Sequence, residues 1–268
     1  MIAIAHLVAT LCYLGAAALA AAPFARPVRV SVRWVTLTLA AGTTAHIVAL
    51  VGLARTGAAP PLTGLGPALS FAALALAGTL LVVELLAREA SLTLLVAPLA
   101  AIVTIAATTV GLVPAVEPPE IRGPWFVAHI ALSFIGIAGL GTAAAAGTMY
   151  LVQRRELRSR RFGALFRLFP PLQTLDRVNH GAVIAAWIGL TLGITIGAAY
   201  AVTYRQNDTA EIVWGTAAWL GATILALGRI ARGWQARRAA IASGAAFAAV
   251  IALWIVVRLT VRGSGDFL

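Results

Sequence analysis

Long apolar stretches separated by short polar gaps dominate the sequence. Each stretch is about as long as the roughly 20 residues that an α-helix needs to cross a bilayer. Proline and arginine mark the gaps between them. The pattern predicts an all-α, polytopic membrane protein in which residues 1–268 form a single helical-bundle domain. Its eight transmembrane helices are expected at approximately 2–22, 34–54, 67–87, 91–113, 125–152, 181–203, 211–228 and 239–261.

The composition agrees with a chain whose solvent is lipid. Hydrophobic residues make up 61% of the chain and charged residues only 11%, whereas a soluble domain carries about 25% charged residues. The first apolar stretch has no basic residue before Arg26 and is longer than the apolar core of a typical signal peptide. We therefore expect it to remain as the first transmembrane helix. The single cysteine, Cys12, lies within it and is interpreted as a packing residue.

Arginine predicts the orientation in the membrane. The chain has 20 basic residues, all of them arginine, and a net charge of +11. When alternate gaps are grouped, 15 arginines lie on one side and five on the other. The positive-inside rule then places the basic loop 153–179 in the cytoplasm and both termini on the non-cytoplasmic side of the inner (cytoplasmic) membrane. Because topology explains the basic charge, we expect no nucleic-acid partner. The five outer arginines are Arg55, Arg122, Arg205, Arg258 and Arg262.

Three of the four histidines are expected in the outer third of the membrane. His129 lies four residues from Trp125, about 6 Å along a helix, and His46 lies about 12 Å from the outer end of its helix. His6 is near the outer end of the first helix. An imidazole at this depth can ligate haem iron, or it can be a neutral histidine hydrogen-bonded to a neighbouring helix. His180, at the inner end, is expected to have a capping or interfacial role.

Two other features of the apolar stretches have structural interpretations. Glu84 precedes Arg88 by one helical turn, so we expect an ion pair between them, with a proton relay as the alternative. Gly189, Gly193 and Gly197 recur every four residues and form one helical face, which predicts a close approach to another helix.

Several segments together resemble one protein family. The segment Trp-Phe-Val-Ala-His-Ile-Ala-Leu-Ser-Phe at 125–134 is the first of them. Their order and spacing, over about 61–262, resemble the cytochrome c assembly family, which includes the haem-handling CcsA and CcmC proteins and the related HemX and YpjD proteins. In that family the histidine matched by His129 is an outward-side haem ligand. The other similar segments are 61–65, 149–157, 172–176, 189–197 and 233–240, together with Trp214 and Trp219.

The sequence also departs from the haem-presenting members of that family. Those members carry a tryptophan-rich WWD segment outside the membrane, but the corresponding residues 200–211 contain no tryptophan. They also place histidines at positions matched here by Ala59, Leu227 and Gly265. The chain thus resembles the reduced HemX/YpjD-like branch, which has a helix-two histidine matched by His46. This favours an assembly factor over an enzyme.

The resemblance implies a haem-binding protein that supports cytochrome c assembly or haem homeostasis. His129 and His46 would be the axial ligands of the haem iron, with His6 as a substitute and Trp125 beside them. Arg55 or Arg122 would pair with the haem propionates. Cytochrome c assembly subunits or a haem-biosynthesis enzyme would be partners besides the lipid bilayer. The alternatives are a non-catalytic partner or regulator of a tetrapyrrole-biosynthesis enzyme, docked through 153–179, and a small-molecule transporter.

Overall fold

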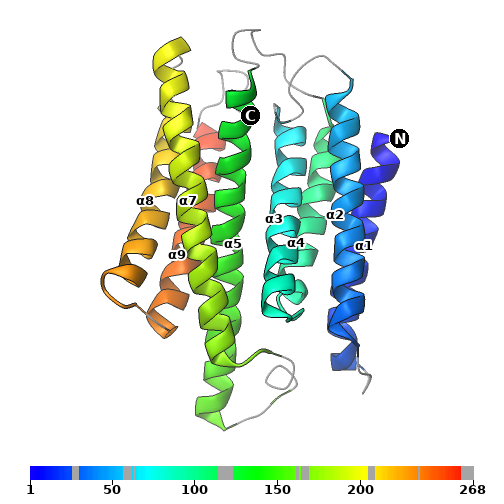
Figure 1. The fold of residues 1–268 in the computed structure, drawn as a ribbon, viewed down its shortest axis with the longest axis vertical. Helices are drawn as coiled ribbons and strands as arrows, with labels where there is room; N and C mark the ends of the chain where they lie inside the picture. Colours follow the sequence, from blue (N-terminus) through cyan, green and yellow to red (C-terminus); the bar gives the residue numbers. More distant parts are fainter. Residues whose placement is uncertain are drawn as a thin grey trace.

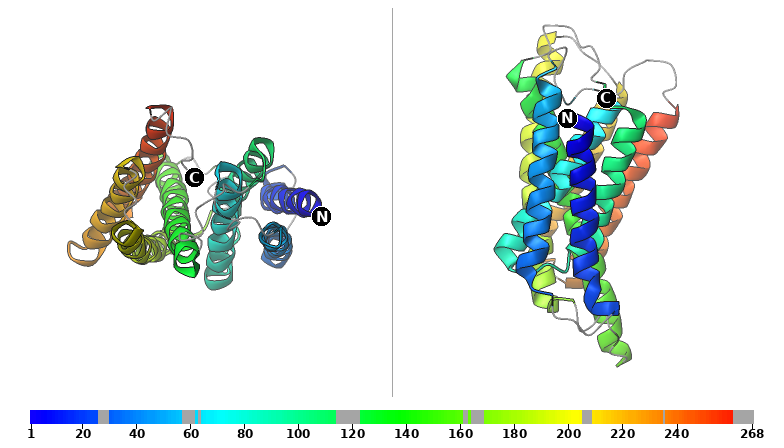
Figure 2. Two further views of the ribbon diagram at one scale, coloured as in Figure 1. Left: turned by 90° about the horizontal axis from the view of Figure 1, so that it is seen from above. Right: turned by 90° about the vertical axis from the view of Figure 1, so that its right-hand side faces the viewer.

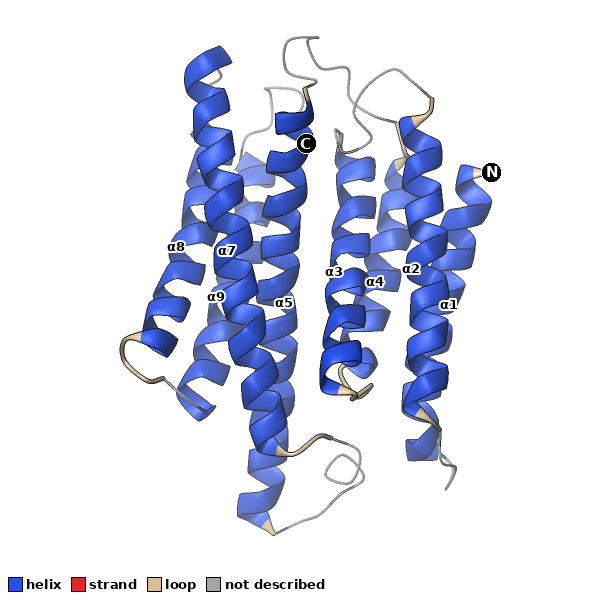
Figure 3. Ribbon diagram, viewed as in Figure 1, coloured by secondary structure: helices blue, strands red, loops and turns tan. Residues whose placement is uncertain are grey.

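A computed structural model describes residues 1–25, 30–56, 62, 64–113, 123–160, 163, 169–204, 209–234 and 236–260. The regular structure in these ranges is entirely helical (Figure 3). Eight described helices are long and apolar enough to span a membrane, which confirms the predicted all-α class and the predicted count. They are α1 (Ile2–Ala25), α2 (Val32–Ala54), α3 (Leu65–Ala87), α4 (Thr93–Val110), α5 (Pro124–Ser159), α7 (Leu172–Tyr204), α8 (Thr209–Ile230) and α9 (Ala236–Thr260).

The helices form two groups of four that lie side by side (Figure 1). In the first group α1 packs against α2 and α4, and α3 packs against α2 and α4. In the second group α5 packs against α7 and α9, and α8 also packs against α7 and α9. Contact between α3 and α5 joins the groups, as the view from above shows (Figure 2). The beginning of α1 and the end of α9 lie at the same end of the bundle (Figure 1).

The bundle contains two buried apolar clusters. The first is centred on the first helix group, where Tyr13 and Leu39 are fully buried, and it extends into the second group through residues such as Met149 of α5. The other lies within the second group and includes Leu140 and Val183. Many other leucine, isoleucine and valine side chains face outward from the bundle. In a membrane these outward side chains contact lipid, while each helix satisfies its backbone hydrogen bonds internally.

The predicted glycine face brings α7 against α5. A Cβ atom at Gly189 would lie 3.1 Å from the Cα atom of Gly136, and one at Gly193 would lie 2.6 Å from the Ser133 hydroxyl. A Cβ atom at Gly197 would meet the ring of His129. The absence of side chains on this face therefore allows the two backbones to approach closely, as the spacing predicted. The same face determines where the imidazole of His129 can lie.

Two helices are longer than predicted. The apolar patterns ended at residue 152 and began again at 181, but α5 continues to Ser159 and α7 begins at Leu172. The expected basic loop 153–179 is thus helical in its described residues 153–159 and 172–179. Glutamine, arginine, glutamate and leucine, which make up 153–158, are strong helix formers. Loss of apolar character marks the edge of the bilayer, whereas the helix itself continues beyond it.

Candidate functional site

Two histidines of the first helix group meet at one serine. The Nε2 atoms of His6, on α1, and His46, on α2, lie 2.8 and 2.9 Å from the hydroxyl of Ser70, on α3. The two rings contact each other edge to face, with centroids 5.1 Å apart. His6 is 1% exposed, and His46 and Ser70 are completely buried. Buried polar groups require hydrogen-bond partners, so this cluster joins three helices through side chains rather than through apolar packing alone.

The remaining contacts indicate which atom donates and which accepts in each hydrogen bond of the cluster. His6 Nδ1 lies 3.0 Å from the carbonyl oxygen of Ile2, which can only accept, so this nitrogen carries the proton. With neutral imidazoles, His6 Nε2 then accepts from the Ser70 hydroxyl, and the Ser70 oxygen accepts from His46 Nε2. His46 Nδ1 accepts from the hydroxyl of Tyr13 at 3.1 Å. Every ring nitrogen of His6 and His46 therefore already has a partner.

His129 is held differently, between α5 and α7. Its Nδ1 atom lies 2.7 Å from the carbonyl oxygen of Gly193, so Nδ1 carries the proton and donates to that oxygen. The tautomer that this bond selects leaves the Nε2 lone pair available, and no described residue forms a hydrogen bond with that atom. A histidine that ligates a metal usually has its second ring nitrogen fixed in this way by a carbonyl or carboxylate. The half-buried imidazole of His129 therefore has the chemistry of a ready ligand.

The structure does not bring all of the other predicted site residues to these two centres. Trp125 is 67% exposed in the first turn of α5, one helical turn from His129. Arg55 is the C-cap residue of α2 and is exposed. Arg122 lies outside the described residues. His180 is exposed on α7, away from both centres along the chain.

The structure thus pairs His6 with His46 in the first helix group and fixes His129 within the second. In the described part of the chain, no three histidine, cysteine, aspartate or glutamate side chains converge on a position for a metal ion. A single imidazole suits haem iron, because the porphyrin itself fills most of the coordination positions.

Glu84 does not form the expected ion pair with Arg88. Its carboxylate is buried and accepts hydrogen bonds from the hydroxyls of Thr36, at 2.8 Å, and Thr93. Arg88 is exposed and ends α3 in a left-handed conformation, with φ 54°. That backbone reversal turns its side chain away from the helical position one turn after Glu84, so the prediction was wrong. The carboxylate instead joins α3 to the neighbouring helices α2 and α4.

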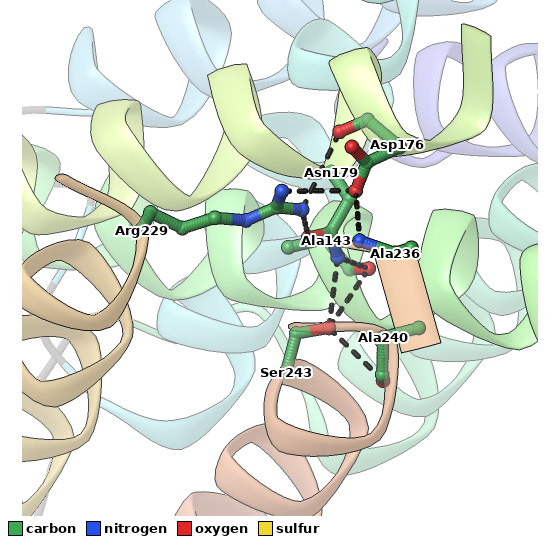
Figure 4. A network of polar contacts seen from close by, with 7 residues as sticks. All are labelled: Ala143, Asp176, Asn179, Arg229, Ala236, Ala240 and Ser243. Carbon is green, nitrogen blue, oxygen red and sulfur yellow. Dashed lines mark hydrogen bonds and ion pairs between the residues drawn. The ribbon is translucent and has the colours of Figure 1, made fainter. Parts of the chain in front are cut away.

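The apolar pattern did not predict a second polar network, which lies within the second helix group (Figure 4). Arg229, on α8, is 8% exposed, and its Nη1 atom lies 2.9 Å from Asp176 Oδ1, on α7. The same guanidinium donates to the side-chain oxygen of Asn179. The Asn179 amide then donates to the carbonyl oxygen of Ala143, at 2.7 Å, and to the hydroxyl of Ser243, at 2.8 Å. This network connects α5, α7, α8 and α9.

Fold and site define a polytopic membrane protein with one histidine nitrogen oriented for ligation. The family model described as Cytochrome C assembly protein matches residues 33–263. The chain therefore belongs to the cytochrome c assembly protein family.

Curated relatives agree with this family. A "Cytochrome c biogenesis protein CcsA" of Prochlorococcus marinus (strain MIT 9515) is 26% identical over 162 residues, covering 52% of this chain and 52% of the relative. The protein of the same name from Synechococcus sp. (strain CC9311) is 26% identical over 171 residues, covering 53% of this chain and 56% of the relative. The chain thus spans about half the length of these relatives. No solved structure shows significant similarity to it.

Proposed function

We propose that this protein binds haem in the inner membrane and handles it during cytochrome c biogenesis, with His129 as an axial ligand of the iron. The proposal rests on the tautomer of His129. Its Nδ1 atom donates to the Gly193 carbonyl oxygen at 2.7 Å, which leaves the lone pair of Nε2 available. Membership of the cytochrome c assembly family supports haem as the group that this nitrogen would bind. Bound haem would supply an iron centre that requires axial donors from the protein.

His46 is the proposed second ligand, with His6 as its substitute. Both are deeply buried, and both Nε2 atoms are occupied by the hydroxyl of Ser70. Ligation by His46 would therefore require Ser70 to rotate away and the imidazole to move its proton from Nε2 to Nδ1. Ser70 then acts as the residue that keeps this pair in a resting state. His129 needs no such exchange, and for this reason we assign it as the first ligand.

Further side chains suit the periphery of a bound haem. Arg55 is exposed at the end of α2, on the side of the bundle where α1 begins, and could pair with a propionate. We assign the same role to Arg122, from the sequence alone. Trp125, exposed at the start of α5, offers an apolar surface beside His129.

We assign this protein a narrower role in cytochrome c biogenesis than the delivery of haem. The residues at 200–211 carry no tryptophan, and we assign the chain to the HemX/YpjD-like branch that lacks the WWD segment. In this proposal it holds haem for cytochrome c assembly subunits or reports haem supply to a haem-biosynthesis enzyme. Both termini face the non-cytoplasmic side, as the arginine bias supports.

Haem titration of the purified protein tests the proposal. The wild-type chain, His129→Ala and His180→Ala are each prepared in detergent and titrated with haem while the Soret band is recorded. His180 is a matched control, because it is an exposed histidine in the same helix group. We expect wild-type protein and His180→Ala to share one saturable, shifted Soret band that His129→Ala lacks. A missing band in the wild type, or an unchanged band in His129→Ala, would refute the proposal.

A further inference from the structure

Four arginines line a cavity at the opposite end of α5 from His129. Three come from the last turns of α5 and one from the first turn of α9. The two helices lie in close contact near this point, since Gly147 leaves no room for a side chain: an added Cβ atom would lie 2.8 Å from the carbonyl oxygen of Ala240. The cavity has a volume of about 410 Å³, within the range of ligand pockets. Its lining residues are Leu151, Arg154, Arg155, Arg158, Ser159 and Arg237.

The four guanidinium groups of this arginine cavity form no ion pair with any described residue. The nearest acid along α5, Glu156, does not line the cavity. Its carboxylate points at Gly163, where a Cβ atom would lie 3.1 Å from Oε1. The cavity is therefore suited to an anion.

The depth of the cavity indicates where that anion would come from. Arg154 lies 29 residues after Trp125 on one continuous helix, which is about 44 Å at 1.5 Å per residue. A bilayer measures about 40–45 Å when its headgroups are included. With Trp125 at one interface, Arg154 falls at the headgroups of the opposite leaflet. Leu151, one turn closer to the membrane centre, supplies the apolar side that an acyl chain would contact.

We propose that the arginine cavity binds the phosphate headgroup of an anionic phospholipid in the leaflet at this end of the bundle. A lipid with two phosphates, such as cardiolipin, should bind most tightly, since four guanidinium groups can each present paired N–H donors to phosphate oxygens. Such a lipid would bridge α5 and α9 and so hold the end of the long α5 helix in place.

Native mass spectrometry of the delipidated, full-length protein in detergent tests this assignment with cardiolipin, phosphatidylglycerol and phosphatidylcholine as probes. The double variant Arg154→Gln/Arg237→Gln removes one cavity arginine from each helix. Arg177→Gln/Arg232→Gln is the control, since it removes two exposed arginines at the same end but outside the cavity. Because each arginine near an anionic headgroup contributes about a factor of five, the cavity variant should bind cardiolipin about 30-fold more weakly.

The control should retain wild-type affinity, and Arg154→Lys/Arg237→Lys, which keeps the charge, should restore most of what the glutamine variant loses. Equal losses of cardiolipin affinity in the cavity variant and the control would overturn the proposal, because binding would then depend on the total positive charge at this end of the protein rather than on the cavity. Displacement of cardiolipin by millimolar pyrophosphate would also overturn it, since the cavity would then serve a soluble anion. A single elution peak for every variant establishes that all of them fold.

Discussion

Replacing Gly197 with alanine tests how α7 positions the candidate ligand. A Cβ atom at this position would lie 2.7 Å from His129 Nδ1 and closer still to Cε1, whereas ordinary contacts begin near 3.4 Å. Because Cε1 lies only 2.4 Å away, the imidazole must move by about 1 Å. A movement of that size along the 2.7 Å bond to the Gly193 carbonyl would stretch it past the usual hydrogen-bond range of about 2.7–3.2 Å.

The size of the effect follows from three competing contributions. Crowding a packed interface costs about 1–3 kcal/mol, and losing a hydrogen bond costs about 0.5–1.5 kcal/mol. Replacing glycine by alanine within a helix returns about 1 kcal/mol. The variant should thus be less stable by about 1–3 kcal/mol. Its haem affinity should fall by about 10–100-fold, as it does when the group that orients a metal-binding histidine is removed.

The matched control is Gly181→Ala on the same helix, where an added Cβ atom would meet nothing within 4 Å. Both variants are titrated with haem in detergent, and the Soret maximum and dissociation constant are compared with those of the wild type. Gly181→Ala should match the wild type, whereas Gly197→Ala should bind weakly with a displaced maximum. If Gly197→Ala binds haem as Gly181→Ala does, the assigned role of the Gly193 carbonyl in orienting His129 is refuted.

Three further predictions concern stability and topology. Ser70→Ala leaves the His46 Nε2 proton without its acceptor and should lower the free energy of unfolding in detergent by about 1–3 kcal/mol. The control Ser91→Ala should cause no such loss, because the Ser91 hydroxyl has no hydrogen-bond partner. Equal effects of the two variants would contradict the proton assignment. Arg229→Met should lower the free energy of unfolding by about 3 kcal/mol, because it leaves the Asp176 carboxylate without its ion-pair partner, and adding Asp176→Asn should recover part of that loss. Strictly additive losses would argue against an energetic coupling of Arg229 and Asp176. Alkaline phosphatase fused to the C-terminus should be active in cells, since the arginine bias places that end outside the cytoplasm, and an inactive, fully expressed fusion would reverse the orientation.

The fold was predictable because a bilayer imposes a minimum length on each helix. Apolar stretches of about 20 residues therefore locate the spans directly. The same reasoning failed at the end of α5 and the beginning of α7, because a helix continues wherever its residues favour it. Glutamine, arginine and glutamate at 153–156 do so without apolar character. The four-residue glycine spacing predicted the α5–α7 contact because helical geometry alone places those positions on one face.

The candidate site was predictable only in part. The sequence placed His6, His46 and His129 at a similar depth, but depth does not show which helices are neighbours. The structure shows that His6 and His46 share Ser70, a serine within an apolar stretch that carries no periodic signal of its own. The tautomer of His129 depends on the Gly193 carbonyl, 64 residues away, which no local pattern predicts.

Paired charges were harder still to predict. Arg229 and Asp176 each lie near the edge of an apolar stretch, and nothing in the sequence pattern pairs them. Their ion pair forms because α8 folds back against α7 and brings together residues 53 positions apart. For Glu84, the one-turn spacing suggested Arg88 as a partner, but the end of α3 and the nearby hydroxyls of Thr36 and Thr93 decided otherwise.

Rescue of a ligand cavity by free imidazole tests most directly whether His129 ligates haem iron. His129→Gly removes the side chain and leaves space where imidazole can enter, so the absorption spectrum of the haem-loaded variant is recorded with and without it. If His129 ligates the iron, the Soret band is lost or displaced in His129→Gly and returns to the wild-type position as imidazole is added. A wild-type spectrum in His129→Gly before any imidazole is present would show that His129 is not a ligand.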